Sequence, residues 1–334
     1  MSSYHVEDIL KQAKDNAVMY KDFKNYIKFD SFQKEELYRK ARETRDKHFS
    51  NKLFVRASME FSNVCLNECK YCGMTKKNKN LERYTIPNEI IKENILQIKE
   101  LGIKQLHLVS GENNELDVDK LCDVIKFATD NSINTTLVLG KKNREDYEKF
   151  YKAGARRYII KFETSNPKLF KEYKNSLLTE RIEQLYVLRE IGFKIGTGII
   201  YDLPNSTIED AMNDLSLLNT IKPDMASASA FSPNAESELA GYKHGDVEQT
   251  LLFIAYLRII LGKYTPTISC SSSLGTEGQY KALMAGANVI SYHITPKEFI
   301  DDFSIYKSSN RIKTKMEAIR DVAKRCNMEI SEYI

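Results

Sequence analysis

Three cysteines that could bind a metal lie close together in the first quarter of the sequence. Cys65, Cys69 and Cys72 have the spacing C-x3-C-x2-C, whereas the remaining three cysteines, at positions 122, 270 and 326, stand far apart. Three thiolates on one short loop can each bind one iron of a [4Fe–4S] cluster, and the fourth iron is then open to a small molecule. The trio therefore indicates an iron–sulfur site with one open position.

A zinc site and a set of incidental thiols stay open as alternatives at this point. A structural zinc site needs four ligands, and the histidines nearest in sequence, His48 and His107, fit no usual zinc spacing. The trio could also be three incidental reduced thiols. A disulfide framework is disfavoured, because such frameworks spread their cysteines through small secreted chains and this chain has 334 residues.

The segments that must position the cysteines alternate between strand and helix patterns. Short apolar runs predict strands at 54–61, 105–109, 135–139, 157–162, 195–200, 225–231, 266–270 and 288–291. Helical patterns lie near 88–101, 116–131, 143–153, 179–191, 207–219, 246–262 and 276–286. This alternation is typical of a parallel sheet with crossover helices. Eight such strands favour an α/β fold with a closed, TIM-like (β/α)8 barrel over an open, doubly wound sheet.

The rest of the chain predicts helical additions to one catalytic domain. We expect an N-terminal helical extension at 1–50, the barrel at 51–300 and a C-terminal helical segment at 301–334, with its helix at about 310–330. The extension carries a helical, amphipathic pattern over residues 4–48. No proline- or glycine-rich linker divides these parts.

The composition favours a cytoplasmic protein that acts on small molecules. There are 50 Lys and Arg against 46 Asp and Glu, which gives a net charge of +4, and the two signs are mixed along the chain. This pattern predicts a solvated surface and gives no reason to expect a nucleic acid or a membrane as partner. The sequence shows no apolar run near 18 residues and no signal-peptide pattern at its start.

The cysteine loop resembles the signature of the radical S-adenosylmethionine (SAM) family, in which an aromatic residue, here Tyr71, precedes the last cysteine. The stretch EFSNVCLNECKYCGMTKKNKNLERY is similar to the biotin-synthase-like branch of that family. The segments VSGEN, KFETSNPKLF, LTERIEQL, GTGIIYDLPNSTIEDAMNDL and MAGANVISYHITP resemble the same branch in order. The resemblance runs from about Arg45 to about Pro296. It is strongest to the [FeFe]-hydrogenase maturase that processes an iron–cysteine precursor, and next to methylornithine synthase.

The resemblance implies two cofactors. A [4Fe–4S] cluster on Cys65, Cys69 and Cys72 would hold SAM on its unique iron through the amino and carboxylate groups of SAM. An electron from the cluster then cleaves the sulfonium and releases a 5′-deoxyadenosyl radical, which abstracts hydrogen from the substrate. The protein supplies binding and orientation for this chemistry. An electron donor such as flavodoxin or ferredoxin is implied as a partner.

The resemblance also implies a set of cofactor-binding residues. They are Tyr71, Ser110, Gly111, Glu112, Lys161, Glu163, Arg181, Gly196 and Gly198. Glu112 would meet the SAM amino group, Glu163 the ribose or amino group, and Arg181 the carboxylate, which a guanidinium can bind with two hydrogen bonds. Two alternatives stay open: Glu163 forms only a surface ion pair with Lys161, or the glycines serve only barrel packing.

One position in this set departs from the maturase pattern. Lys161 stands where the maturase has an arginine. Lysine keeps the positive charge but lacks the planar fork of a guanidinium. We therefore expect the SAM contacts to be rearranged at this position.

Residues at the ends of the later strands are the expected substrate-facing residues. They are Phe231, Cys270, Ser271, Tyr292 and His293. Cys270 is equally consistent with a small buried residue, and His293 with a hydrogen-bonded structural histidine. Cys122 and Cys326 lie on predicted helices with no cysteine beside them, so a second cluster has little support.

We therefore expect a radical SAM enzyme that acts on a small substrate in the barrel lumen, with a hydrogenase-maturase-like activity on a thiol- or iron-bearing molecule. The alternatives are an amino-acid carbon-skeleton rearrangement, as methylornithine synthase performs on lysine, and sulfur insertion. A non-catalytic iron–sulfur scaffold is an alternative of another class, and the combination of Glu112, Glu163 and Arg181 argues against it.

Overall fold

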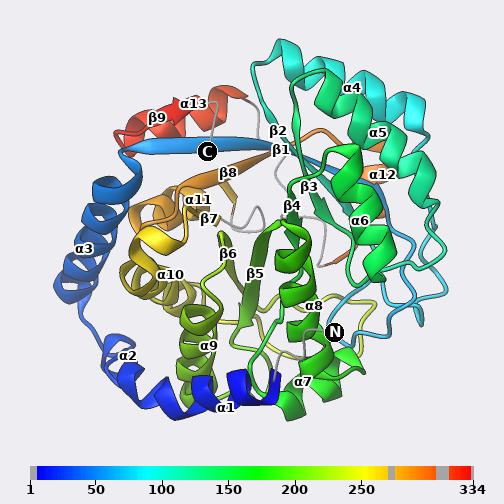
Figure 1. The fold of residues 1–334 in the computed structure, drawn as a ribbon. Coiled ribbons are helices and arrows are strands. Elements are labelled where there is room, and N and C mark those ends of the chain that lie inside the picture. The colour runs from blue at the N-terminus through cyan, green and yellow to red at the C-terminus, as the bar shows by residue number, and fades with distance from the viewer. Residues whose placement is uncertain (1–5, 270–274, 306–315, 332–334) are drawn as a thin grey trace.

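Eight parallel strands close into a barrel in the computed structural model of the chain (Figure 1). The structure describes residues 6–269, 275–305 and 316–331, so the predicted site residues Cys270 and Ser271 lie outside the described part. Neighbouring strands follow one another from β2 to β8, and β1 pairs with both β8 and β2. That double pairing closes the sheet, which confirms the TIM-like barrel and excludes the open, doubly wound alternative.

The predicted strands are all present within a few residues of their expected bounds. They are β1 (Lys52–Ser62), β2 (Gln105–Ser110), β3 (Asn134–Val138), β4 (Arg157–Ile159), β5 (Lys194–Tyr201), β6 (Met225–Ala230), β7 (Thr267–Ser269) and β8 (Val289–His293). The shortest are β4 and β7. Strand β4 is three residues shorter than predicted. Its regular strand pairing ends at Ile159, although the apolar pattern continues to residue 162.

Helices cover the outside of the barrel. They are α4 (Asn88–Glu100), α5 (Val118–Asp130), α6 (Arg144–Ala153), α7 (Pro167–Lys174), α8 (Leu178–Ile191), α9 (Ile208–Ile221), α10 (Val247–Leu261), the 3-10 turn η2 (Gly262–Tyr264) and α11 (Gly275–Met284). Glycines end α6 and α8, with positive φ angles of 121° at Gly154 and 109° at Gly192.

The short helix α7 was not predicted from the sequence. Its start is marked by Asn166, whose side chain accepts hydrogen bonds from the backbone N–H groups of Lys168 and Leu169, and by Pro167 in the first turn. An asparagine cap followed by proline is a recognised helix start, so the signal was present in the sequence.

The N-terminal segment forms several helices. They are α1 (Val6–Asn16), the 3-10 turn η1 (Ala17–Tyr20), α2 (Phe23–Tyr26) and α3 (Ser31–Phe49). Asp30 and Gln33 form a capping box at the start of α3, which separates it from α2. These helices pack against the barrel helices, α1 on α9 and α3 on α10.

The C-terminal segment differs from the single helix that was expected. It contains α12 (Lys297–Ile300), α13 (Met316–Arg325) and a further strand, β9 (Glu329–Ser331). Strand β9 pairs in parallel with Lys52–Phe54, the start of β1. The helix ends at Arg325, earlier than predicted, and the residues beyond it extend the sheet.

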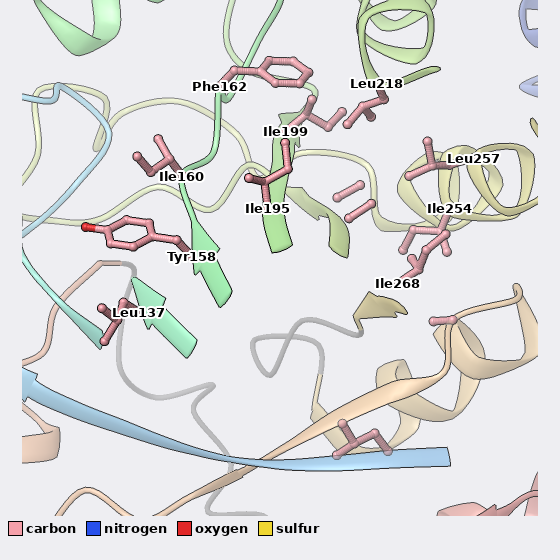
Figure 2. Close-up of a cluster of buried hydrophobic side chains, with 14 of the residues drawn as sticks. Leu137, Tyr158, Ile160, Phe162, Ile195, Ile199, Leu218, Ile254, Leu257 and Ile268 are labelled. Carbon is pink, nitrogen blue, oxygen red and sulfur yellow. The ribbon is translucent and has the colours of Figure 1, made fainter. Parts of the chain in front are cut away.

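The main hydrophobic core lies between the strands and the surrounding helices. Figure 2 shows part of it, with Ile195 and Ile199 of β5 and Ile254 and Leu257 of α10 among the labelled side chains. All four are fully buried. None of the helices in the described parts of the chain has the length and apolarity needed to span a bilayer.

Helix α9 also fixes the loop that follows β4. The Asp214 carboxylate accepts a hydrogen bond of 2.6 Å from the backbone N–H of Ser165, and Asp210 accepts one of 2.9 Å from the side chain of Asn166. Asp214 is buried, and burial raises its pKa to about 7, with Asp210 contributing a smaller increase. The folded protein therefore keeps a proton that the unfolded chain releases at a much lower pH.

Because Asp214 keeps this proton, we predict that the folded state loses stability as pH rises. An acid with a raised pKa stabilises the folded state below its folded pKa, and this contribution disappears as pH rises through about 7. Between pH 5 and pH 8 we expect the free energy of unfolding of the apoprotein to fall by roughly 2 to 3 kcal/mol from this group. Asp214→Asn should flatten that change, measured by urea unfolding at both pH values. The control is Asp119→Asn, an exposed carboxylate, and equal pH dependence in both variants would contradict the assignment.

Candidate functional site

The cysteine trio lies on the loop between β1 and α4, at the carboxyl end of β1. Cys69 is buried, Cys65 and Cys72 are half-buried, and all three are free thiols. Burial is the main cause that raises the pKa of Cys65. Burial and, to a smaller extent, the neighbouring Cys69 raise the pKa of Cys72 to about 12. Thiols in such a setting stay protonated until a metal takes the place of the proton.

The loop is held in shape by its own polar groups. The Arg83 guanidinium donates hydrogen bonds to four backbone carbonyls of the loop, those of Asn63, Met74, Thr75 and Asn78. The backbone N–H of Leu66 donates to the backbone carbonyl of Glu112, and that of Lys70 donates to the backbone carbonyl of Tyr173, both at 2.9 Å. The positions of the thiols are therefore set by the chain. Nothing in the spacing of the sequence pointed to Arg83.

The donor set fits a cubane cluster better than a single metal ion. In the part of the chain that the structure describes, no three His, Cys, Asp or Glu side chains converge as ligands of one ion. Zinc needs such convergence, whereas each thiolate of a [4Fe–4S] cluster binds a different iron. Three cysteines from one rigid loop satisfy that requirement.

The segment Ser110-Gly111-Glu112 follows β2 and lies directly against the cysteine loop. A Cβ atom on Gly111 would stand 2.3 Å from the carbonyl oxygen of Val64 and 2.7 Å from Cβ of Cys65. The cysteine loop itself therefore requires a glycine here, and the contact of Gly111 with SAM stays a prediction. The Ser110 hydroxyl donates to the Gly111 carbonyl at 2.7 Å.

Glu112 forms a buried ion pair with Arg181 of α8. The Arg181 guanidinium lies 3.2 Å from the carboxylate, and the arginine side chain is only 7% exposed. Burial on its own would raise the pKa of Glu112, but the charges of Arg181 and Lys174 outweigh it and lower that pKa. Glu112 is therefore ionised at neutral pH.

A second ion pair joins Lys161 to Glu163. The Lys161 ammonium lies 2.9 Å from the Glu163 carboxylate, and both side chains are mostly buried, so this is not a pair on the open surface. Glu163 has a φ of 61°, in the left-handed region, and its backbone still pairs with β5 beyond the end of β4. Its N–H donates to Gly198 and its carbonyl accepts from Ile200, which fixes the strained residue in place.

Lys174, at the end of α7, is a member of this charged group that sequence reasoning missed. Burial acts to lower the pKa of Lys174, but Cys69, Glu112 and Glu163 raise it above its ordinary value. Its positive charge therefore acts on the cysteine loop and on both carboxylates. Because α7 itself was not predicted, no pattern in the sequence placed Lys174 near the cysteines.

Tyr71 is buried beside the cysteines in a second hydrophobic cluster, which also holds Cys69, Leu169, Tyr173, Leu203, Phe231 and Leu239. The Tyr71 hydroxyl has no hydrogen-bond partner within the described structure. Burial and the charges of Glu163 and the thiols keep the pKa of Tyr71 well above its usual range. Tyr71 is therefore a neutral phenol that faces the charged group.

The glycines of β5 are explained by the neighbouring strands. A Cβ atom on Gly198 would stand 2.1 Å from the Ser227 carbonyl oxygen of β6, and one on Gly196 would stand 2.6 Å from Ile159 of β4. The barrel-packing alternative thus accounts for both positions. Their contact with SAM stays a prediction.

The barrel interior is hollow and carries polar side chains among apolar ones, whereas layers of branched apolar side chains usually fill such barrels. It holds a cavity of about 240 Å³. Polar lining residues come from several strands and their carboxyl ends: Arg56, Ser58, Glu60, His107, Lys161, Thr197, Ser227, Ser229, Thr267, Ser269, Ser291 and His293. This lumen is the space available to a substrate.

Of the described residues that were expected to face substrate, only His293 lines this cavity. Its neighbour Tyr292 packs into the main core, because consecutive residues of a strand point to opposite faces of the sheet. Phe231 is buried in the second hydrophobic cluster and is not among the described lining residues. Cys122 and Cys326 pack against the main core as free thiols.

Comparison with known proteins agrees with this arrangement. Residues 59–218 match the Radical SAM superfamily. The [FeFe] hydrogenase maturase subunit HydE of Thermotoga maritima is 35% identical over 274 residues, which cover 81% of this chain and 79% of that protein. A 3-methylornithine synthase of Methanosarcina acetivorans is 26% identical over 77% of this chain and 73% of that protein.

Solved structures show the same fold. The crystal structure of methylornithine synthase (PylB) matches with a TM-score of 0.81 at 23% identity, and covers 96% of this chain and 97% of that one. The cysteine loop lies at the carboxyl end of β1, and a relative that is 35% identical aligns with 81% of this chain. The chain therefore belongs to the radical SAM superfamily, the enzymes that use a [4Fe–4S] cluster and S-adenosylmethionine.

Proposed function

We propose that this radical SAM enzyme acts on a small polar molecule bound in the barrel lumen, with an activity similar to that of the [FeFe]-hydrogenase maturase. The observation that carries the proposal is the position of Lys161. Its side chain lines the lumen cavity and lies 3.4 Å from Ser229, while its ammonium pairs with Glu163 beside the cysteine loop. The lumen therefore opens directly onto the charged group.

Cys65, Cys69 and Cys72 would hold the cluster, and the charged group would hold SAM. The group carries two carboxylates, Glu112 and Glu163, and the cations Arg181, Lys161 and Lys174. The head of SAM carries one ammonium and one carboxylate, so each can replace a partner in the present ion pairs. When bound, the two cofactors supply a reductively generated 5′-deoxyadenosyl radical.

The chain's own residues exclude water from this site and hold it next to the lumen. Arg181 and Tyr71 are almost completely buried, so ion pairs in the group are stronger than they would be in solvent. Arg83 and the end of β2 keep the cysteine loop rigid. The lumen next to this rim is lined in part by hydroxyl, imidazole and cationic side chains, which supports a substrate with hydrogen-bonding groups.

The cluster assignment predicts a selective effect of one cysteine. Anaerobic reconstitution of the wild type with iron and sulfide should give about four irons per chain. With dithionite and SAM the wild type should form 5′-deoxyadenosine, and Cys69→Ala should lose both properties. The matched control is Cys122→Ala, a half-buried thiol on α5 far from the loop in sequence, which should retain both. A Cys69→Ala protein that still cleaves SAM would contradict the assignment.

The SAM assignment predicts a specific loss at Arg181. Arg181→Lys keeps the charge but removes the fork that binds a carboxylate with two hydrogen bonds, so SAM affinity should fall about tenfold or more. Iron content should not change. The control is Arg189→Lys on the same helix, where the guanidinium donates to the Ile221 and Lys222 carbonyls. SAM binding is measured by the change in the electron paramagnetic resonance spectrum of the reduced cluster. Equal affinities of the two variants would refute the role of Arg181.

The substrate class is tested by deuterium transfer. Deuterated L-cysteine presented with ferrous iron, and deuterated L-lysine, are each incubated with the reduced enzyme and SAM. Deuterium in 5′-deoxyadenosine identifies the molecule from which hydrogen is abstracted, and mass spectrometry measures it. Transfer from the iron–cysteine mixture supports the maturase-like proposal. Transfer from lysine alone would replace it with an activity similar to that of methylornithine synthase.

A further inference from the structure

We propose that His293, oriented by Glu60, is a catalytic acid–base residue that contacts the substrate in the lumen. The inference rests on the proposed function, because it assigns a role within the same cavity. His293 ends β8 and its side chain is 9% exposed, while Glu60 lies on the adjacent β1 and is 4% exposed. The two side chains form a buried imidazole–carboxylate pair that faces the lumen.

The geometry of the pair fixes the orientation of the ring. Nδ1 of His293 lies 3.1 Å from Oε1 of Glu60. A carboxylate accepts hydrogen bonds, so Nδ1 carries the proton and donates it to Glu60. Nε2 is then the free, basic nitrogen of the neutral ring.

Glu60 is itself held as an acceptor by neighbouring hydroxyl groups. Ser58 donates to Oε1 at 3.1 Å, and Thr295 donates to Oε2. The Glu60 backbone N–H in turn donates to the Thr295 hydroxyl at 2.8 Å. Ser58, Thr295 and His293 thus place three donors on the two oxygens of Glu60. Three donors favour the ionised carboxylate and keep it from rotating away from the ring.

Nε2 of His293 is the unsatisfied atom of this network. It is fully buried and has no hydrogen-bond partner within the described structure. A buried nitrogen without a partner destabilises the folded protein unless a ligand or water meets it. The ring lines the lumen cavity, so the partner that completes this nitrogen is a molecule in the lumen.

The remaining titratable groups that line the lumen serve this purpose less well. Burial and the charges of Arg56 and Arg157 keep the pKa of His107 well below its usual range, so His107 stays neutral. Lys161 is engaged with Glu163, and Arg56 donates to Ser291 at 3.0 Å. Among the described lining groups, His293 therefore offers the cavity a ring nitrogen that has no hydrogen-bond partner.

The proton transfer balances without any further reactant. A proton leaves an acidic X–H group of the substrate, such as a thiol or an ammonium, and joins Nε2. The ring becomes an imidazolium, its Nδ1–H stays on Glu60, and the carboxylate stabilises the new positive charge. The reverse transfer returns the proton to the product. Such a residue contributes about 10²- to 10⁴-fold to a rate.

Two variants and two readouts test the pair. His293→Gln should retain the cluster, SAM binding and slow substrate-independent cleavage of SAM, but lose about 100-fold or more in turnover of the iron–L-cysteine probe. Glu60→Gln should lose less and should displace the pH limb that reports imidazole titration in the kcat/KM profile. Added imidazole should partly restore turnover of His293→Gln. His244→Gln, outside the lumen, is the control and should match the wild type.

The tautomer is tested separately in the apoprotein with 15N-labelled histidine. We expect the Nδ1–H form for His293 in the wild type and a mixture in Glu60→Gln. A Nε2–H form in the wild type, or wild-type turnover and pH profile in His293→Gln, would overturn the proposal and leave the proposed function intact. If the wild type cleaves SAM but turns over no probe, the proposed function fails instead, and the acid–base role fails with it.

Discussion

Strand β1 makes backbone pairs with three other strands, and the rest of the structure depends on them. Its start pairs with β9, its middle with β8 and its end with β2. The same strand carries Arg56, Ser58 and Glu60 into the lumen and continues into the cysteine loop. Any shift of one residue in its register would turn Glu60 away from His293 and move the thiols away from Glu112.

The members of the charged group pair with one another, with three cations around two carboxylates. Five buried or mostly buried charges would destabilise the fold if they stood alone. They alternate in sign, from Arg181 to Glu112 and from Lys161 to Glu163, with Lys174 acting on both carboxylates. A zwitterionic ligand exchanges one set of pairs for another, so little net charge has to be desolvated when it binds.

The sequence predicted the barrel well, because apolar runs are local patterns and they located all eight barrel strands. The role of the cysteine trio as cluster ligands stays a prediction. Residues set by tertiary contact were missed or misplaced: Lys174 on α7, Arg83 within the loop, and Tyr292, which the pleat turns away from the lumen. Gly111 is also required by the close approach of the Val64 backbone, and its contact with SAM stays a prediction. Glu60 was missed because its partners come from Ser58, His293 and Thr295, two of them more than 200 residues away.

The pairing of β1 with β8 and β9 also sets an order of events during synthesis. The thiols leave the ribosome before β8 and β9, which follow them by more than 200 residues in the chain. At about 5–20 residues per second, the cysteine loop waits on the order of tens of seconds without its final support. A cluster would therefore meet a fixed loop only after β8 and β9 have been made and have paired with β1.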